Sequence, residues 1–123
     1  MFQQTVLVGY VGGEPEEKFT ADGKLLAFFS VATSKRSKGQ AGENVDKTTW
    51  FRITTSGTLA EAMVKYLKKG SKVLVVGELN SDTDTGSPKV YQKKDGSWGA
   101  SYELYAQTVR FLSDKEEQRE VGW

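Results

Sequence analysis

Five stretches of the chain carry apolar residues at the spacing of β-strands, either alternating with polar residues or in short continuous runs. They are rich in Val, Ile, Thr, Tyr and Phe, which fit the pleated surface of a sheet. Segments rich in Gly, Asp, Ser and Lys separate them, notably residues 35–47 and 80–99, and Ala21-Asp22-Gly23 predicts a hairpin turn. The predicted strands are Thr5–Val11, Lys24–Ser34, Thr48–Thr55, Lys72–Leu79 and Ser101–Leu112.

One helix is predicted between the third and fourth strands. Thr58 and Glu61 have the spacing of a capping box, in which each side chain bonds a backbone amide of the first turn. Lys68 and Lys69 are expected in the last turn, where cations meet the negative end of the helix dipole, and Gly70 is expected to end the helix. The apolar face is predicted to consist of Leu59, Met63, Tyr66 and Leu67.

The order of these elements predicts the fold class. Three strands, one helix and two further strands are the arrangement of an all-β OB fold, a five-stranded Greek-key barrel with one helix between strands 3 and 4. A chain of 123 residues has room for one such domain. We expect the barrel to occupy residues 1–112 and a short acidic tail to occupy residues 113–123.

Side-chain parity along the third strand separates a core face from an outer face. Phe51 and Ile53 share one face and are expected in the core, whereas Trp50, Arg52 and Thr54 share the other. The outer face would then hold an indole ring beside a guanidinium group. A buried position for Trp50 is the alternative.

The second strand shows the same alternation. Ala27, Phe29 and Val31 are expected in the core, and Leu26, Phe28 and Ser30 on the opposite face. For an outward Phe28 the sequence leaves two interpretations open, a stacked base or a second subunit.

Charge and composition narrow the function classes. Seventeen basic and sixteen acidic side chains leave a net charge of +1, which argues against binding nucleic acid through bulk charge alone. Histidine and cysteine are both missing, so the commonest general base and metal ligand and any thiolate site are excluded. We expect no catalysis, no metal and no cofactor, and a cytoplasmic protein, since no secretory signal or membrane-length apolar run appears.

Two segments pair cations with aromatic rings, the combination that suits single-stranded nucleic acid, because bases stack on rings while cations follow the phosphates. Ordinary solvated loops, with Tyr91 and Trp98 packed on each other, are the alternative. The first segment, 35–52, carries Lys35, Arg36, Lys38, Lys47, Trp50 and Arg52, and the second, 89–98, carries Lys89, Tyr91, Lys93, Lys94 and Trp98.

Along residues 1–112 the chain resembles the bacterial single-stranded DNA-binding protein family. The matching stretches are Thr5–Gly9, Gly13–Glu16, Ser30–Ser34, Trp50–Ile53, Leu59–Glu61, Tyr66–Val73, Val76–Leu79 and Tyr102–Leu104. The resemblance implies an OB fold, sequence-tolerant binding of single strands and a homotetramer, with a dimer as the alternative. It also implies that Trp50 and Arg52 are a stacking ring and its neighbouring cation, and that Tyr91 stands where the family often has a tryptophan.

The chain departs from the family pattern at two ring positions and at its end. Residues 35–38 (Lys-Arg-Ser-Lys) and Ser56 stand where many members have an aromatic, so we expect weaker or more salt-sensitive binding. Family tails recruit repair and replication enzymes through an acidic tip. The ending Glu120–Trp123 is short, and such recruitment is not expected here.

The sequence therefore predicts sequence-independent binding and protection of single-stranded DNA in replication, recombination and repair, near the nucleoid. An OB module used mainly for protein–protein contact in a replication assembly is the alternative. The predicted nucleic-acid-binding residues are Trp50, Arg52, Tyr91, Phe28, Trp98, Lys35, Arg36, Lys38, Lys89, Lys93 and Lys94.

Overall fold

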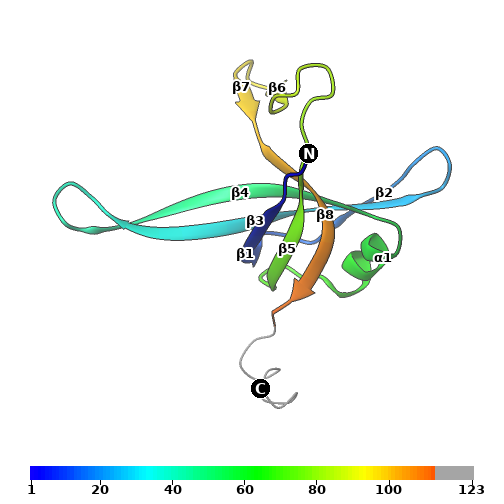
Figure 1. The fold of residues 1–123 in the computed structure, drawn as a ribbon, viewed down its shortest axis with the longest axis horizontal. Helices are drawn as coiled ribbons and strands as arrows, with labels where there is room; N and C mark the ends of the chain where they lie inside the picture. Colours follow the sequence, from blue (N-terminus) through cyan, green and yellow to red (C-terminus); the bar gives the residue numbers. More distant parts are fainter. Residues whose placement is uncertain (113–123) are drawn as a thin grey trace, which may run out of the picture.

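Five strands close into a barrel in the computed structural model, which describes residues 1–112 (Figure 1). They run in the order β1-β5-β8-β4-β3, and β1 pairs with β3 to close the ring. A helix lies between β4 and β5, the third and fourth barrel strands, which confirms the predicted OB fold. The expected tail, 113–123, lies outside the described residues. The barrel strands are β1 (Thr5–Val11), β3 (Leu25–Lys38), β4 (Asn44–Ser56), β5 (Lys72–Leu79) and β8 (Tyr102–Phe111).

The predicted loop at 35–47 is wrong, because β3 and β4 continue through it as a long two-stranded ribbon. Only residues 39–43 turn between the two strands. Polar contacts extend the ladder: Arg36 Nε lies 3.2 Å from the Asp46 carboxylate, and the hydroxyls of Ser34 and Thr48 are 3.3 Å apart. The ribbon leaves the barrel and is exposed over most of its length. Both of its faces are therefore largely polar, and the alternation that marks a half-buried strand is lost.

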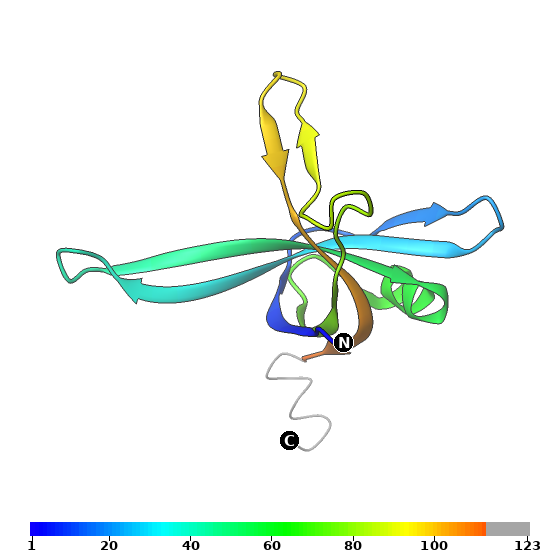
Figure 2. The ribbon, with the colours of Figure 1, turned by 45° about the horizontal axis from the view of Figure 1, so that its top comes forward.

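Three short strands complete two further hairpins. β2 (Glu16–Phe19) pairs with the start of β3, and the turn between them contains Gly23 at φ +86°, as the sequence predicts. β6 (Val90–Gln92) and β7 (Trp98–Ala100) pair with each other in a two-stranded sheet outside the barrel. The β2–β3, β3–β4 and β6–β7 hairpins project from the barrel in three directions (Figure 2).

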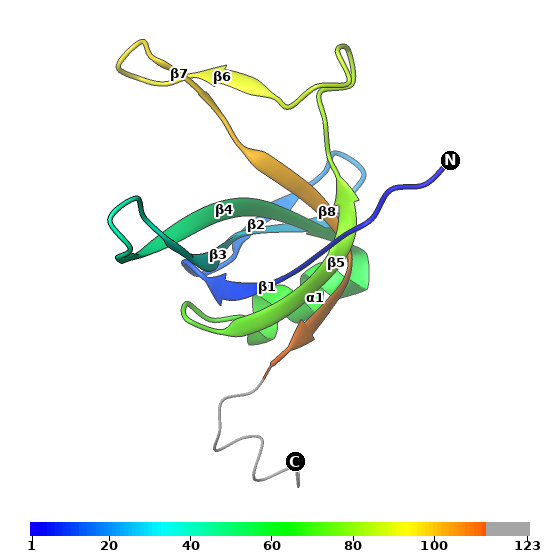
Figure 3. The same ribbon diagram turned by 60° about the vertical axis from the view of Figure 1, so that its left-hand side comes forward.

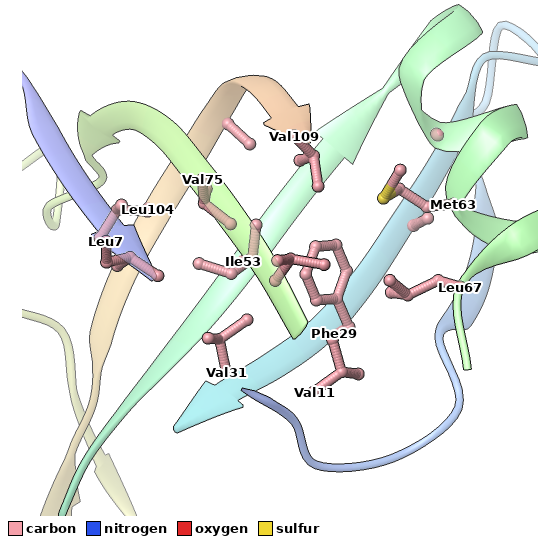
Figure 4. Close-up of a cluster of buried hydrophobic side chains, with 14 residues drawn as sticks. Leu7, Val11, Phe29, Val31, Ile53, Met63, Leu67, Val75, Leu104 and Val109 are labelled. Atoms are coloured by element: carbon pink, nitrogen blue, oxygen red, sulfur yellow. The ribbon is translucent and has the colours of Figure 1, made fainter. Parts of the chain in front are cut away.

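The core fills the barrel and continues under the helix (Figure 4). Phe29 and Ile53 are buried at its centre, as their parity predicts, and Met63 of the helix points toward them. The remaining buried apolar side chains are Leu7, Val11, Ala27, Val31, Ala60, Leu67, Val73, Val75, Leu104, Ala106 and Val109.

The predicted capping box is wrong. The helix α1 (Gly57–Tyr66) begins one residue before Thr58, and Ser56 is its N-cap without any side-chain capping hydrogen bond. The Ser56 hydroxyl instead hydrogen-bonds the Tyr105 hydroxyl of β8. Gly57 has φ +62°, a conformation that glycine adopts without steric cost, so the chain turns directly from β4 into the helix.

The helix also ends earlier than predicted. Leu67 leaves the helical conformation and buries its side chain in the core, so Lys68 and Lys69 lie in the following turn rather than in the last helical turn. The Gly70 amide donates to the Val11 carbonyl at 2.8 Å, which fixes this turn to β1. Tyr66, predicted on the apolar face, is 59% exposed. Its neighbour Leu67 enters the core instead.

Candidate nucleic-acid interface

Trp50 and Arg52 lie on the outer face of β4, as their parity predicts. Trp50 is 54% exposed and Arg52 is exposed, while Ile53, which points into the barrel, is fully buried. Thr54 shares this outer face but is only 9% exposed, since Phe28 of β3 and Tyr105 of β8 flank it in the ladder. An exposed ring and an exposed cation therefore lie two residues apart on one rigid strand.

The turn after β1 packs against the Trp50 ring. Gly12 donates its amide to the Ser30 carbonyl at 2.9 Å, so the turn is held against β3. A Cβ atom placed on Gly12 would lie 2.6 Å from Cζ3 of Trp50, which shows how closely the ring covers this backbone. A neighbouring Cβ on Gly13 would meet nothing within 4 Å.

Phe28 lies in the same region and is half-buried. The Arg52 guanidinium carbon lies 5.2 Å from the centroid of the Phe28 ring, within the range of a cation–π contact. A hollow of about 280 Å³ opens beside both groups. Its lining consists of Gly12, Gly13, Glu14, Glu16, Phe28, Phe29, Ser30, Trp50 and Arg52.

A second hollow, of about 450 Å³, lies on the other side of Trp50. It shares Ser30, Trp50 and Arg52 with the first, and so the indole and guanidinium stand between two recesses. Tyr91 lines it from the β6–β7 arm, which projects above the β3–β4 arm in Figure 3. Phe51, Ser101 and Glu103 complete the lining.

The register of the β6–β7 hairpin separates its two aromatic rings. Tyr91 pairs with Gly99, and the Lys93 side chain approaches the same glycine, so these side chains gather on one face. Trp98 pairs with Gln92 on the opposite face and is 67% exposed. The two rings therefore do not pack on each other, and Trp98 does not line either hollow beside Trp50.

The register of the β3–β4 arm sorts its cations in the same way. Arg36 and Lys38 lie on the face of the ribbon that carries Trp50, whereas Lys35 lies opposite Lys47 on the other face. Arg36 is partly neutralised by its ion pair with Asp46, and both side chains remain largely exposed. The arm thus presents Arg36 and Lys38 in line with the indole.

The remaining predicted cations are exposed on or next to the β6–β7 arm. Lys89 immediately precedes β6, and Lys94 lies in the turn between the two strands. Asp95 shares that turn, and hydrogen bonds from the Ser97 hydroxyl and amide lower the pKa of its carboxyl group. Its negative charge offsets one of the neighbouring lysines at neutral pH.

Another hollow, of about 810 Å³, lies at the C-terminal end of the helix, and the sequence did not predict it. Lys65 lies 5.4 Å from the Tyr66 ring centroid and Lys72 lies 5.9 Å from that of Tyr10. The sequence signal was present in the lysines of 65–72, but only the fold adds the rings of β1 and β8 to them. Its lining consists of Tyr10, Lys65, Tyr66, Lys68, Lys69, Gly70, Ser71, Lys72, Phe111 and Leu112.

Residues 1–112 contain neither a candidate membrane-spanning helix nor a candidate metal site. No helix in this range is long and apolar enough to span a membrane. No group of three Asp, Glu, His or Cys side chains is placed to hold a metal ion in the described part of the chain.

The sequence matches the family described as the single-strand binding protein family over residues 2–112. A single-stranded DNA-binding protein of Neisseria meningitidis is 33% identical over 114 residues, which cover 93% of this chain and 62% of that protein. This chain thus spans less than two thirds of that relative's length. The corresponding protein of Thermotoga maritima is 34% identical, with 93% of this chain and 76% of that protein covered.

Solved structures give the same picture of the fold. The SSB protein of Plasmodium falciparum, in a complex with single-stranded DNA, superposes with a TM-score of 0.73 at 26% identity, covering 92% of this chain and 97% of that chain. A single-stranded DNA-binding protein from Thermus aquaticus gives a TM-score of 0.68 at 21% identity, covering 91% of this chain and 51% of that one, a likeness of fold alone.

Proposed function

This chain belongs to the single-strand binding protein family, and on that basis we propose that it binds and protects single-stranded DNA without reading its sequence. It acts by binding rather than by catalysis, in replication, recombination and repair, in the cytoplasm near the nucleoid. Residues 1–112 form the DNA-binding domain. The relatives' names favour this function over a module used mainly for protein–protein contact.

The observation that carries the proposal is the exposed Trp50 beside Arg52 on β4, with a hollow on each side. A base stacked on an aromatic ring is worth about 1–3 kcal/mol whatever its identity, because every base has a π-face. The neighbouring guanidinium adds a positive charge and hydrogen-bond donors for the same nucleotide. Tyr91 offers a second ring in the hollow of about 450 Å³. Phe28, which contacts the Arg52 guanidinium, exposes part of its ring in the hollow of about 280 Å³.

The phosphate path follows the two arms. Arg36 and Lys38 support it on the Trp50 face of the β3–β4 ribbon, and Lys93 supports it beside Tyr91. The remaining predicted groups serve a strand that extends along the arms, because they lie away from the Trp50 face or line neither hollow beside it. Lys35 is on the opposite face of the β3–β4 ribbon, and the others are Lys89, Lys94 and the ring of Trp98.

A homo-oligomer, a tetramer by family resemblance, is part of the same proposal. Val6 and Val8 of β1 are 57% and 44% exposed and pair with the half-buried Val76 and Leu74 of β5 on the outer face of the sheet. We call these four residues the β1–β5 patch. Among residues 1–112, β1 has no strand partner along its second edge before Tyr10, so this edge is open to a strand of another copy.

Titration with oligo-dT at low salt tests the function. We expect the tryptophan fluorescence to fall on stacking, and the affinity to fall as salt rises, by about 0.7 log units per phosphate contact for each tenfold rise in salt. Filter binding should show strong preference for single-stranded over duplex DNA. Unchanged fluorescence together with equal retention of both DNAs would contradict the proposal and favour the protein–protein module.

A further inference from the structure

The hollow between Trp50 and Phe28 carries two carboxylates in an interface otherwise suited to a polyanion. Glu14 and Glu16 line the same recess of about 280 Å³ as Trp50, Phe28 and Arg52. A carboxylate and a phosphate that share a recess repel each other, because both are negatively charged. The recess therefore disfavours the phosphates of the DNA backbone. A flat base, which is uncharged and stacks on the rings, fits the same walls.

Neither carboxylate forms an ion pair within residues 1–112. The ion pair found within residues 1–112 joins Arg36 to Asp46, so neither Glu14 nor Glu16 is paired with a cation there. Glu14 accepts a hydrogen bond of 3.5 Å from the Lys69 amide and is tied to the turn after the helix. Glu16 is the first residue of β2 and lies opposite Phe28, so its exposed side chain stands at the rim of the recess beside that ring.

The recess therefore presents one hydrogen-bond acceptor, the Glu16 carboxylate, and one donor, the Arg52 guanidinium. An ionised carboxylate only accepts hydrogen bonds and a guanidinium only donates them. Cytosine offers an exocyclic amino donor next to a ring nitrogen and a carbonyl, both acceptors, which matches Glu16 and Arg52 together. Thymine has a carbonyl oxygen where cytosine has its amino group, and that oxygen would face the carboxylate unfavourably.

We propose that Glu16, acting with Arg52, makes this recess selective for bases that carry an exocyclic amino group over thymine. The inference rests on the proposed binding of single-stranded DNA and adds a base preference to it. Stacking on Trp50 supplies affinity for any base, and the carboxylate adds a difference between bases. Binding is then tolerant of sequence but not uniform.

The test compares oligo-dC with oligo-dT of equal length, because every register of a homopolymer places the same base in the recess. Fluorescence anisotropy of end-labelled oligonucleotides gives both dissociation constants at mildly alkaline pH, where cytosine is uncharged. In Glu16→Gln we expect the ratio of the dT to the dC dissociation constant to fall at least about threefold, since a charge-assisted hydrogen bond is lost. Glu17→Gln is the matched control, because Glu17 pairs with Ala27, on the other face of β2, and does not line the recess.

The outcomes separate this inference from the function on which it rests. A ratio that falls in Glu16→Gln but not in Glu17→Gln supports it. Equal strengthening of dC and dT binding in Glu16→Gln would show plain repulsion of the backbone and overturn the base preference alone. Failure of the unaltered protein to bind either homopolymer would overturn the proposed function and this inference with it.

Discussion

At the scale of single residues, exposure and contact decide which side chains serve the core and which serve a ligand. Ile53 and Trp50 lie three positions apart on β4, yet the first is fully buried and the second is 54% exposed. Strand parity assigns them to opposite faces, and the barrel makes one of those faces the interior. The same strand therefore supplies a core residue and the ring that we propose stacks on bases.

Replacing Trp50 by alanine should weaken binding of oligo-dT more than replacing Lys38. Loss of one stacked base is expected to cost about 1–3 kcal/mol, whereas one exposed cation contributes less at moderate salt. Isothermal titration of both variants gives the comparison. A larger loss for Lys38→Ala would indicate an electrostatic groove without stacking.

Replacing Ile53 by alanine should lower the free energy of unfolding by about 2–5 kcal/mol, because it removes three carbon atoms and leaves a cavity at the centre of the barrel. Urea denaturation followed by circular dichroism measures the change. Val45→Ala, on the exposed β3–β4 arm, is the control and should cost far less. Equal losses in both variants would contradict the assignment of the core.

At the scale of elements, the proposed binding face is completed by turns and arms attached to the barrel. The β1–β2 turn supports the Trp50 ring, β2 brings Glu16 beside Phe28, and the β6–β7 arm brings Tyr91 across from β4. None of these elements is part of the closed ring of strands. Changes in them are therefore expected to alter binding more than folding.

Gly12→Ala and Gly13→Ala test this separation. The added methyl group at Gly12 would lie 2.6 Å from the Trp50 ring and displace it, while the same group at Gly13 meets nothing within 4 Å. We expect Gly12→Ala to shift the tryptophan emission and weaken oligo-dT binding several-fold, at about the cost of one impaired stacking contact. Gly13→Ala should leave the tryptophan emission unchanged, because its methyl group does not reach the Trp50 ring, and an equal emission shift there would contradict a specific role of Gly12.

At the scale of the whole molecule, the surfaces proposed for DNA and for a second subunit lie on different parts of the barrel. The two hollows around Trp50 face the arms, whereas the β1–β5 patch lies on the outer face of another part of the sheet. Exposed apolar patches on soluble domains commonly mark contacts between proteins. Self-association through the patch would thus leave Trp50 and Arg52 accessible to DNA.

Val8→Glu should dissociate the proposed homo-oligomer while each subunit stays folded. The new carboxylate would have to be buried without a partner among apolar side chains at the interface, which is strongly unfavourable. Light scattering after size-exclusion chromatography should show a lower mass for this variant. Val45→Glu, an equally apolar position on the arm, should keep the mass of the unaltered protein. An unchanged mass for Val8→Glu would place the interface elsewhere.

The sequence by itself determined the barrel and the orientation of its strands. Two of the predicted strands, Thr5–Val11 and Lys72–Leu79, coincide with β1 and β5, and the outward position of Trp50 and Arg52 follows from alternation alone. These features are local, since a half-buried strand shows its two faces as a period of two along the chain. The core positions of Ala27, Phe29 and Val31 follow for the same reason.

The tertiary structure alone decided which surfaces these strands build. Residues 35–47 are almost entirely polar on both faces, so their strand pairing left no periodic signal. The hydroxyl of Ser56, the N-cap residue, hydrogen-bonds Tyr105, 49 positions along the chain, instead of capping the helix. The hollows join Gly12, Phe28, Trp50 and Tyr91 from four separate segments. Such contacts depend on register and closure of the barrel, which bring distant residues together and which no local pattern of polarity encodes.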